Sequence, residues 1–252
     1  MYYVYGVVRE GHPPPKRKGV GAPPADVTLV ESASLAAAVT ELPDDYVAGE
    51  EDARAHLNVL IALLKDGTVI PLRMGTVEPD EEAVRTDVLD SAQAEMGRRL
   101  DALDGLVELH VDADDDESES IAAVAGAAGV RIPAHADLDT KLEIGQQVAS
   151  LLVEHRRRLA EEILAELRPF AAGDTPRSVG AGPEDPVLRW AFLVKRDDLE
   201  SFDDAVIAVR SHHPSVAIRY VGPLPPAHFV DWDRVPAEAK PDSFSAQGRW
   251  SW

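Results

Sequence analysis

The sequence predicts an α+β protein of two domains, each a small, mostly antiparallel sheet packed with helices. Strand-like and helix-like patterns follow one another along 252 residues, a length that suits one or two domains. The pattern restarts at Asp104-Gly105, which divides residues 1–105 from residues 106–230. The second block runs strand, long helix, strand, helix, strand, which is close to the order of a ferredoxin-like fold.

The first block opens with a strand and a loop. Tyr2 to Val8 is rich in aromatic and β-branched residues, which favours a strand. Residues 12–24 contain five prolines and are expected to form a loop. Residues 27–42 are ambiguous, because their alanines favour a helix whereas a polar break at residues 31–34 favours a hairpin. Both alternatives stay open at this point.

Two helices and one strand complete the first block. Residues 45–64 carry apolar side chains at three- and four-residue spacing, which predicts a helix. Residues 68–74 predict a strand, and residues 81–103 predict one further helix.

The second block begins with residues 106–113, whose alternating polarity predicts a strand. The acidic segment at residues 112–120 has three aspartates at the opening spacing of a calcium loop. Such a loop needs Gly and Glu where this chain has Glu117 and Ala123, so we expect a solvated turn.

A long helix is predicted at residues 137–170, where a broad apolar stripe includes Leu138 and Leu142. A flexible loop, a strand, a helix and a last strand are expected in turn at residues 172–186, 187–195, 197–211 and 216–221. Residues 231–252 form a polar tail with Trp250 and Trp252, which we expect to fold back onto the second domain because exposed aromatic area is costly.

Composition excludes several classes of function. The formal net charge of −20 opposes binding to nucleic acid and to anionic lipid membranes. Without cysteine the chain has no disulfides, zinc–thiolate sites or cysteine nucleophiles. Neither a signal peptide nor a membrane-spanning run is recognisable, so we expect a soluble cytoplasmic protein.

Motifs for catalysis or cofactor binding are not found in the sequence. The eight histidines include no pair at the helical spacing of metal ligands, and no nucleotide-binding loop or serine elbow is present. We therefore expect no catalytic residues, no metal and no other cofactor. The many carboxylates leave an acid–base enzyme on an α+β fold as an alternative.

Two stretches stand out as rigid surface scaffolds. In "VIPLRMGTVEP", residues 69–79, Pro71 suits a strand edge, Gly75 suits a turn and Thr76 suits a helix cap. Arg73 is the cation within this apolar strand. In "YVGPLPPAHFV", residues 220–230, three prolines stiffen the exit from the last strand.

These stretches, with others in the same order along residues 2–230, resemble motifs of the gas vesicle protein F/L family (GvpF/GvpL). The similar segments are "YVYG", "IPLRMGTVEPDEEAV", Leu103 with Gly105 and Glu108, "FLV", Phe202 and "GPLPPAHF". Met74, Glu78, Leu224 and Ala227 stand where the family pattern has aromatic residues. The resemblance implies a hairpin at residues 27–42.

The resemblance also implies a function. Members of the family are non-enzymatic accessory proteins of gas vesicle assembly, which contact the hydrophobic shell protein GvpA and other vesicle proteins. The expected location is the gas vesicle in the cytoplasm, and the alternative role is a minor structural component of the mature vesicle. The candidate partner-binding residues are Arg73, Met74, Glu78, Leu224, Pro225, Pro226 and Phe229.

Arg73 has two possible roles. A cation buried in a strand requires a carboxylate partner, so we expect Arg73 to pair with a carboxylate such as Glu108 and to clamp the sheet. The alternative is direct contact with a partner protein.

Overall fold

The computed structural model describes residues 1–131, 133–177 and 186–230. The chain forms two compact units, one of residues 1–108 with 223–230 and the other of residues 109–222. Both contain an antiparallel sheet packed with helices, which confirms the predicted α+β class. The sequence assigned residues 223–230 to the second domain, whereas here they belong to unit 1. The predicted tail lies outside the described residues.

Strand β1 (Tyr2–Arg9) is the centre of the unit 1 sheet. The sheet order is β2-β3-β1-β4, and β5 also pairs with β1. The other strands are β2 (Thr28–Ser32), β3 (Leu35–Glu41), β4 (Ile70–Pro71) and β5 (Val77–Glu78). The β2–β3 pair confirms the hairpin, and Ala33 at its turn has a positive φ of 50°.

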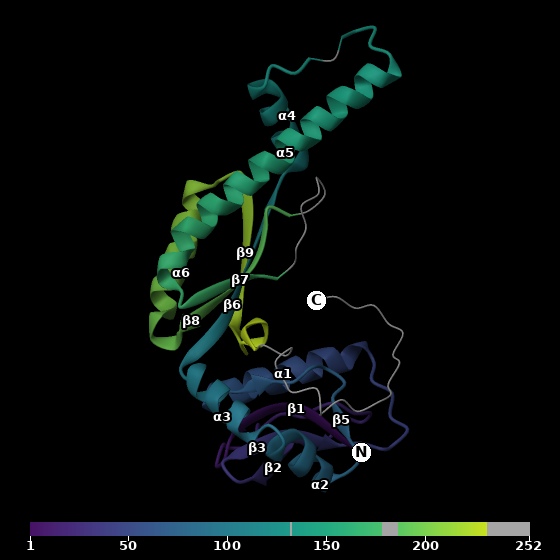
Figure 1. Ribbon diagram of the computed structural model, residues 1–252, viewed down its shortest axis with the longest axis vertical. Helices are drawn as coiled ribbons and strands as arrows, with labels where there is room; N and C mark the ends of the chain where they lie inside the picture. Colours follow the sequence, from purple (N-terminus) through teal and green to yellow (C-terminus); the bar gives the residue numbers. More distant parts are fainter. Residues whose placement is uncertain (132, 178–185, 231–252) are drawn as a thin grey trace. The chain divides into compact units, whose positions relative to one another are not determined.

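Helices cover both faces of the unit 1 sheet (Figure 1). Strands β1 and β3 accordingly have buried side chains on both faces. Helix α1 (Glu50–Asp66) lies over one face, and α2 (Glu81–Ala83) with the π-helical turn η1 (Val84–Asp90) lies over the other.

The single helix predicted at residues 81–103 is wrong. It is divided into α2, η1 and α3 (Gln93–Ala102). The Ser91 N–H donates to the carbonyl of Thr86, five residues earlier, and Ala92 leaves helical backbone angles. Asp80, rather than Thr76, caps the first turn by accepting a hydrogen bond from the N–H of Ala83.

Unit 2 has the ferredoxin-like strand order that the sequence predicts. Strands β6, β7, β8 and β9 follow one another along the chain and lie in the order β7-β8-β6-β9. Their bounds are β6 (Leu106–Asp115), β7 (Gly173–Pro176), β8 (Leu188–Lys195) and β9 (Val216–Leu224).

Helices α5 (Leu138–Leu167) and α6 (Leu199–His212) lie side by side on one face of this sheet (Figure 1). Val107, Leu109, Val111 and Ala113 are all buried, and they share one face of β6 because side chains alternate along a strand. Glu108, His110, Asp112 and Asp114 alternate with them along β6 and form a polar opposite face. Unit 2 also contains the short helical turns η2 (Arg168–Phe170) and η3 (Arg196–Asp198), whereas the turn η4 (Ala227–Phe229) belongs to unit 1.

Two elements of unit 2 were missed by the sequence analysis. The predicted acidic turn is instead the end of β6 followed by helix α4 (Glu117–Ala127), which Asp116 caps by accepting from the N–H of Glu119. The predicted flexible loop contains β7, where Asp174 accepts a hydrogen bond from the Trp190 ring at 2.7 Å. The described helices include none that is both long and apolar enough to cross a bilayer.

Candidate partner-binding surfaces

The first candidate surface is a bulge at residues 72–76, which interrupts the strand that runs along β1. On one side of it Pro71 pairs with Gly6, and on the other Val77 pairs with Tyr3. Leu72 and Thr76 bond to the consecutive residues Tyr5 and Val4 at 2.8 and 2.9 Å. The three residues between them pair with no backbone group of β1, so the chain must loop outward there.

Gly75 lets this bulge close. Its φ of +87° lies in the left-handed region, which glycine adopts without steric cost. The Thr76 hydroxyl donates to the carbonyl of Arg73 at 2.7 Å and holds the turn. Thr76 therefore supports the bulge instead of the following helix.

Buried polar side chains hold the bulge from inside unit 1. The Tyr3 hydroxyl accepts the N–H of Gly75 at 3.2 Å and lies 2.9 Å from Nδ1 of His56 on α1. Burial lowers the pKa of His56 to about 4, although a hydrogen bond to the backbone of Leu72 opposes this shift. Burial also raises the pKa of Tyr3. Both side chains are therefore neutral near pH 7.

Arg73 lies exposed on the bulge, which corrects the predicted clamp. It forms no ion pair with any residue in the described ranges. Glu108, its expected partner, instead accepts hydrogen bonds from His228. An exposed arginine without a described carboxylate partner is suited to contact with another protein.

The other bulge residues are partly accessible. Met74 and Glu78 are half-buried, and Val77, which the sequence analysis did not single out, is 37% exposed. Burial raises the pKa of Glu78, and the nearby charges of Asp87 and Asp80 raise it further. This surface therefore combines one cation with apolar and acidic side chains.

The second candidate segment, residues 224–229, is less accessible than the bulge. Pro225 and Pro226 are buried, and their carbonyls accept the N–H groups of Ala227 and Phe229 in the turn η4. Leu224 and Phe229 are half-buried. Of the predicted residues in this segment, these two offer surface to a partner, while the prolines support the turn.

The two predicted segments are held by different strands. Residues 72–78 bond to β1, whereas the turn η4 bonds to β6 through Glu108 and His228. We therefore treat them as two separate surfaces of unit 1.

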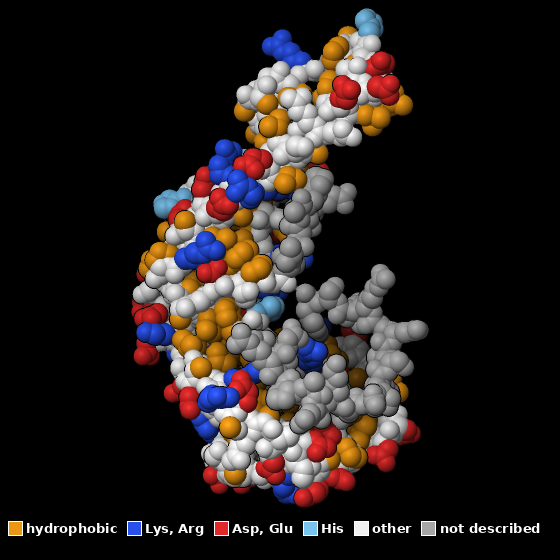
Figure 2. Space-filling view, in the orientation of Figure 1, with side chains coloured by type: hydrophobic (Ala, Val, Ile, Leu, Met, Phe, Trp, Pro, Cys, Tyr) orange, Lys and Arg blue, Asp and Glu red, His pale blue; other side chains and the backbone are white. Residues whose placement is uncertain are grey.

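A third apolar surface lies on α4 and the first half of α5. Ile121, Leu138 and Leu142 are 36%, 70% and 56% exposed, and Figure 2 shows hydrophobic side chains at the free end of this helix pair. Both leucines belong to the apolar stripe predicted for this helix, but the structure leaves this part of the stripe exposed. The buried apolar residues of α5 (Leu152, Ile163, Leu164 and Leu167) lie between its midpoint and its C-terminal end.

The helix lengths explain this exposure. A helix of 30 residues is about 45 Å long, whereas a strand of 8 residues spans roughly 26 Å. One end of α5 must therefore extend beyond the sheet. This mismatch was visible in the predicted element lengths and could have identified the exposed leucines.

Comparison with known proteins shows similarity over both units. A family model described as gas vesicle synthesis protein GvpL/GvpF matches residues 1–231. Gas vesicle protein F of Streptomyces sp. (strain CB03234) is 33% identical over 241 residues, covering 91% of this chain and 99% of that protein. Gas vesicle protein L of the same strain is 28% identical over 255 residues, with coverage of 91% and 92%.

The fold is also similar to a solved structure. The crystal structure of gas vesicle protein GvpF from Anabaena sp. PCC7120 matches with a TM-score of 0.75 at 23% identity. The match covers 90% of this chain and 94% of that one. The two proteins therefore share their fold.

Proposed function

Because this chain belongs to the GvpL/GvpF family of gas vesicle proteins, we propose that it is a non-enzymatic accessory protein of gas vesicle assembly. In this role it binds the hydrophobic shell protein, GvpA, and other vesicle proteins, and it acts at the gas vesicle in the cytoplasm. The match of residues 1–231 to a family described by gas vesicle synthesis carries the proposal.

The apolar side of the shell subunit explains why such a protein is needed. A subunit that presents an apolar side to gas will aggregate in water unless another protein covers that side. The chain offers exposed apolar side chains beside the bulge and on α4 and α5. Its net charge of −20 keeps a complex with an apolar partner in solution.

Co-expression with tagged shell protein, followed by a pull-down, tests the proposal. We expect the wild-type chain to be retained by the shell protein. The bulge variant Arg73→Ala with Val77→Ser should be retained several-fold less. The matched control, Arg54→Ala with Leu57→Ser, changes an exposed arginine and an exposed apolar residue on α1 and should bind like wild type.

The same assay separates the bulge from the apolar helix pair. If Leu138→Ser with Leu142→Ser loses binding while the bulge variant does not, the binding surface lies on α5. The control Ile207→Ser changes a comparably exposed residue, 58% accessible, on α6. If the wild-type chain fails to retain shell protein at all, the proposed function is wrong.

The alternative role, a minor structural component, is tested in purified vesicles. An assembly factor is expected to be depleted when vesicles are washed, whereas a structural component stays at constant stoichiometry. Quantitative immunoblots of washed vesicles distinguish the two. Constant stoichiometry would replace the proposed role by the structural one.

A further inference from the structure

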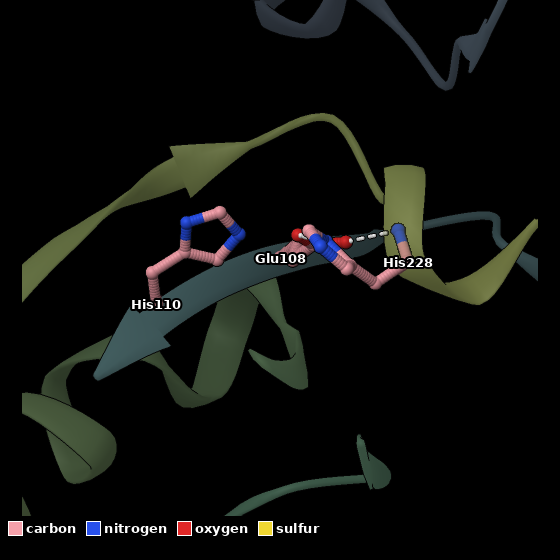
Figure 3. Close-up of side chains that lie close together, drawn as sticks. All are labelled: Glu108, His110 and His228. Carbon is pink, nitrogen blue, oxygen red and sulfur yellow. Dashed lines mark hydrogen bonds and ion pairs between the residues drawn. The ribbon is translucent and has the colours of Figure 1, made fainter. Parts of the chain in front are cut away.

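Three ionisable side chains gather at the polar face of strand β6. Glu108, His110 and His228 each place one donor atom so that all three atoms lie within 4.8 Å of one another (Figure 3). Local sequence patterns do not reveal this group, because His228 is 120 residues from Glu108 along the chain.

The arrangement depends on local structure. Glu108 and His110 are two residues apart on β6, so their side chains leave the same face of the strand. The turn η4 brings His228 to the carboxylate. Its backbone N–H lies 2.9 Å from Oε2 of Glu108, and its Nδ1 lies 2.6 Å from Oε1.

The environment of Glu108 is unusual for a carboxylate. It is 1% exposed, and a buried carboxylate needs strong polar partners to offset its lost hydration. His228 supplies two of them. The side chain of His228 is itself 28% exposed, so water and small ions can reach the group from that side.

We propose that Glu108, His110 and His228 bind a divalent transition-metal ion, zinc in particular. Two imidazole nitrogens and one carboxylate oxygen form a donor set that suits zinc, with a further position open to water. Calcium and magnesium prefer oxygen donors alone, so they fit this set poorly. The bound ion replaces the His228–Glu108 hydrogen bond and fastens the turn η4 to β6.

A second histidine–carboxylate group provides an internal comparison. His212 and His213, at the end of α6, contact different oxygens of Glu166 at 2.7 and 2.9 Å. Among the described residues, the close grouping of three donor atoms is found at Glu108 and not at Glu166. The group of His212, His213 and Glu166 therefore serves as a control, because it shows how much zinc binds to surface histidines that do not form a three-ligand site.

Zinc titration of the full-length, chelator-treated chain tests the inference. Isothermal calorimetry and native mass spectrometry should find one zinc ion per chain, and zinc should raise the melting temperature because it binds the folded state. Loss of a group that only supports a ligand costs roughly 10- to 100-fold in metal affinity, so His110→Gln, which removes a ligand itself, should weaken zinc binding by more than about tenfold. His212→Gln should bind zinc like wild type.

His110 is half-buried and on the polar face, so His110→Gln should keep a wild-type circular dichroism spectrum. His228→Gln is a second variant that removes a proposed zinc ligand. The inference is wrong if the wild-type chain binds no stoichiometric zinc, or if His110→Gln binds it equally well. Pull-downs with shell protein in the presence of chelator measure shell-protein binding without zinc. Failure of the zinc site and failure of the proposed function can therefore be distinguished.

Discussion

His56 shows how one buried side chain shapes a surface that it does not reach. It is 7% exposed, and it connects α1 to Tyr3, which in turn holds the backbone of the bulge. Because the neutral ring fits this site and the charged ring does not, the pKa of His56 falls to about 4. The bulge should therefore depend on the protonation state of this residue.

Acid should destabilise the protein through His56. Well above pH 6.5 the ring is neutral in both the folded and the unfolded chain. As the pH falls through 6.5 the unfolded chain takes up a proton first, so the free energy of unfolding decreases, by roughly 3 kcal/mol in total by pH 4. Urea denaturation between pH 7 and pH 4 should give a shallower pH dependence for His56→Gln than for wild type. The exposed control His135→Gln should retain the wild-type dependence.

Arg73→Ala should leave the melting temperature unchanged, because Arg73 is exposed and has no described ion-pair partner. This reverses the expectation from the sequence alone, where a buried clamp predicted a large loss of stability. Differential scanning fluorimetry of Arg73→Ala and Arg54→Ala measures the effect. A large decrease in melting temperature for Arg73→Ala, without one for Arg54→Ala, would show that Arg73 has the structural role.

Gly75→Ala should destabilise the bulge by about 1 kcal/mol, because alanine resists a φ of +87° although nothing lies within 4 Å of the added methyl group. The same substitution at Gly145, in the helical backbone of α5, should raise stability by roughly 0.5–1 kcal/mol. If chemical denaturation gives changes of opposite sign in the free energy of unfolding for the two variants, backbone conformation explains the effect. Equal stability changes for Gly75→Ala and Gly145→Ala would contradict this explanation.

At the scale of elements, helix α5 is fastened to the sheet by one buried ion pair. Arg156 lies 2.8 Å from Asp115 on β6, and their side chains are 9% and 4% exposed. Burial alone would raise the pKa of Asp115, but the hydrogen bond from Arg156 lowers it overall. This contact lies within the packed part of α5, one turn after the buried Leu152.

Arg156→Ala should lower the free energy of unfolding by about 3–5 kcal/mol, because it leaves a buried carboxylate without its cation. The neighbouring Arg157 is the control. It is 57% exposed and pairs with Glu154 and Glu161 on the surface of α5, so Arg157→Ala should change the melting temperature little. Similar losses for both variants, measured by urea denaturation, would contradict the assignment.

At the scale of the whole molecule, the acidic composition and the exposed apolar residues have separate roles. The net charge of −20 favours solubility, and the apolar side chains provide the proposed contact with shell protein. Salt screens charges but does not weaken apolar contacts.

Retention by the shell protein should therefore survive an increase in salt from about 0.15 to about 0.5 M, where the screening length falls well below 8 Å. Repeating the pull-down at both concentrations measures this. Loss of binding at the higher concentration would show that ion pairs, with Arg73 the first candidate, hold the partner.

Local patterns predicted most of the elements and little of the site. Residues 2–8, 45–64 and 137–170 have long, regular patterns, and each forms the expected strand or helix within a few residues. The short strand β7 and the divided helix at residues 81–102 were missed or wrong. Their form depends on neighbours, Trp190 for β7 and the sheet beneath η1, that local periodicity does not contain.

The sequence by itself determined the α+β class, the ferredoxin-like order of the second unit and the resemblance to gas vesicle proteins. All three depend on the spacing of residues along the chain. The tertiary structure alone decided that Arg73 is exposed, that Leu138 and Leu142 lie beyond the sheet, and that His228 meets Glu108. These facts depend on which distant segments pack together, because burial and pairing are properties of the folded chain and not of any single stretch of it.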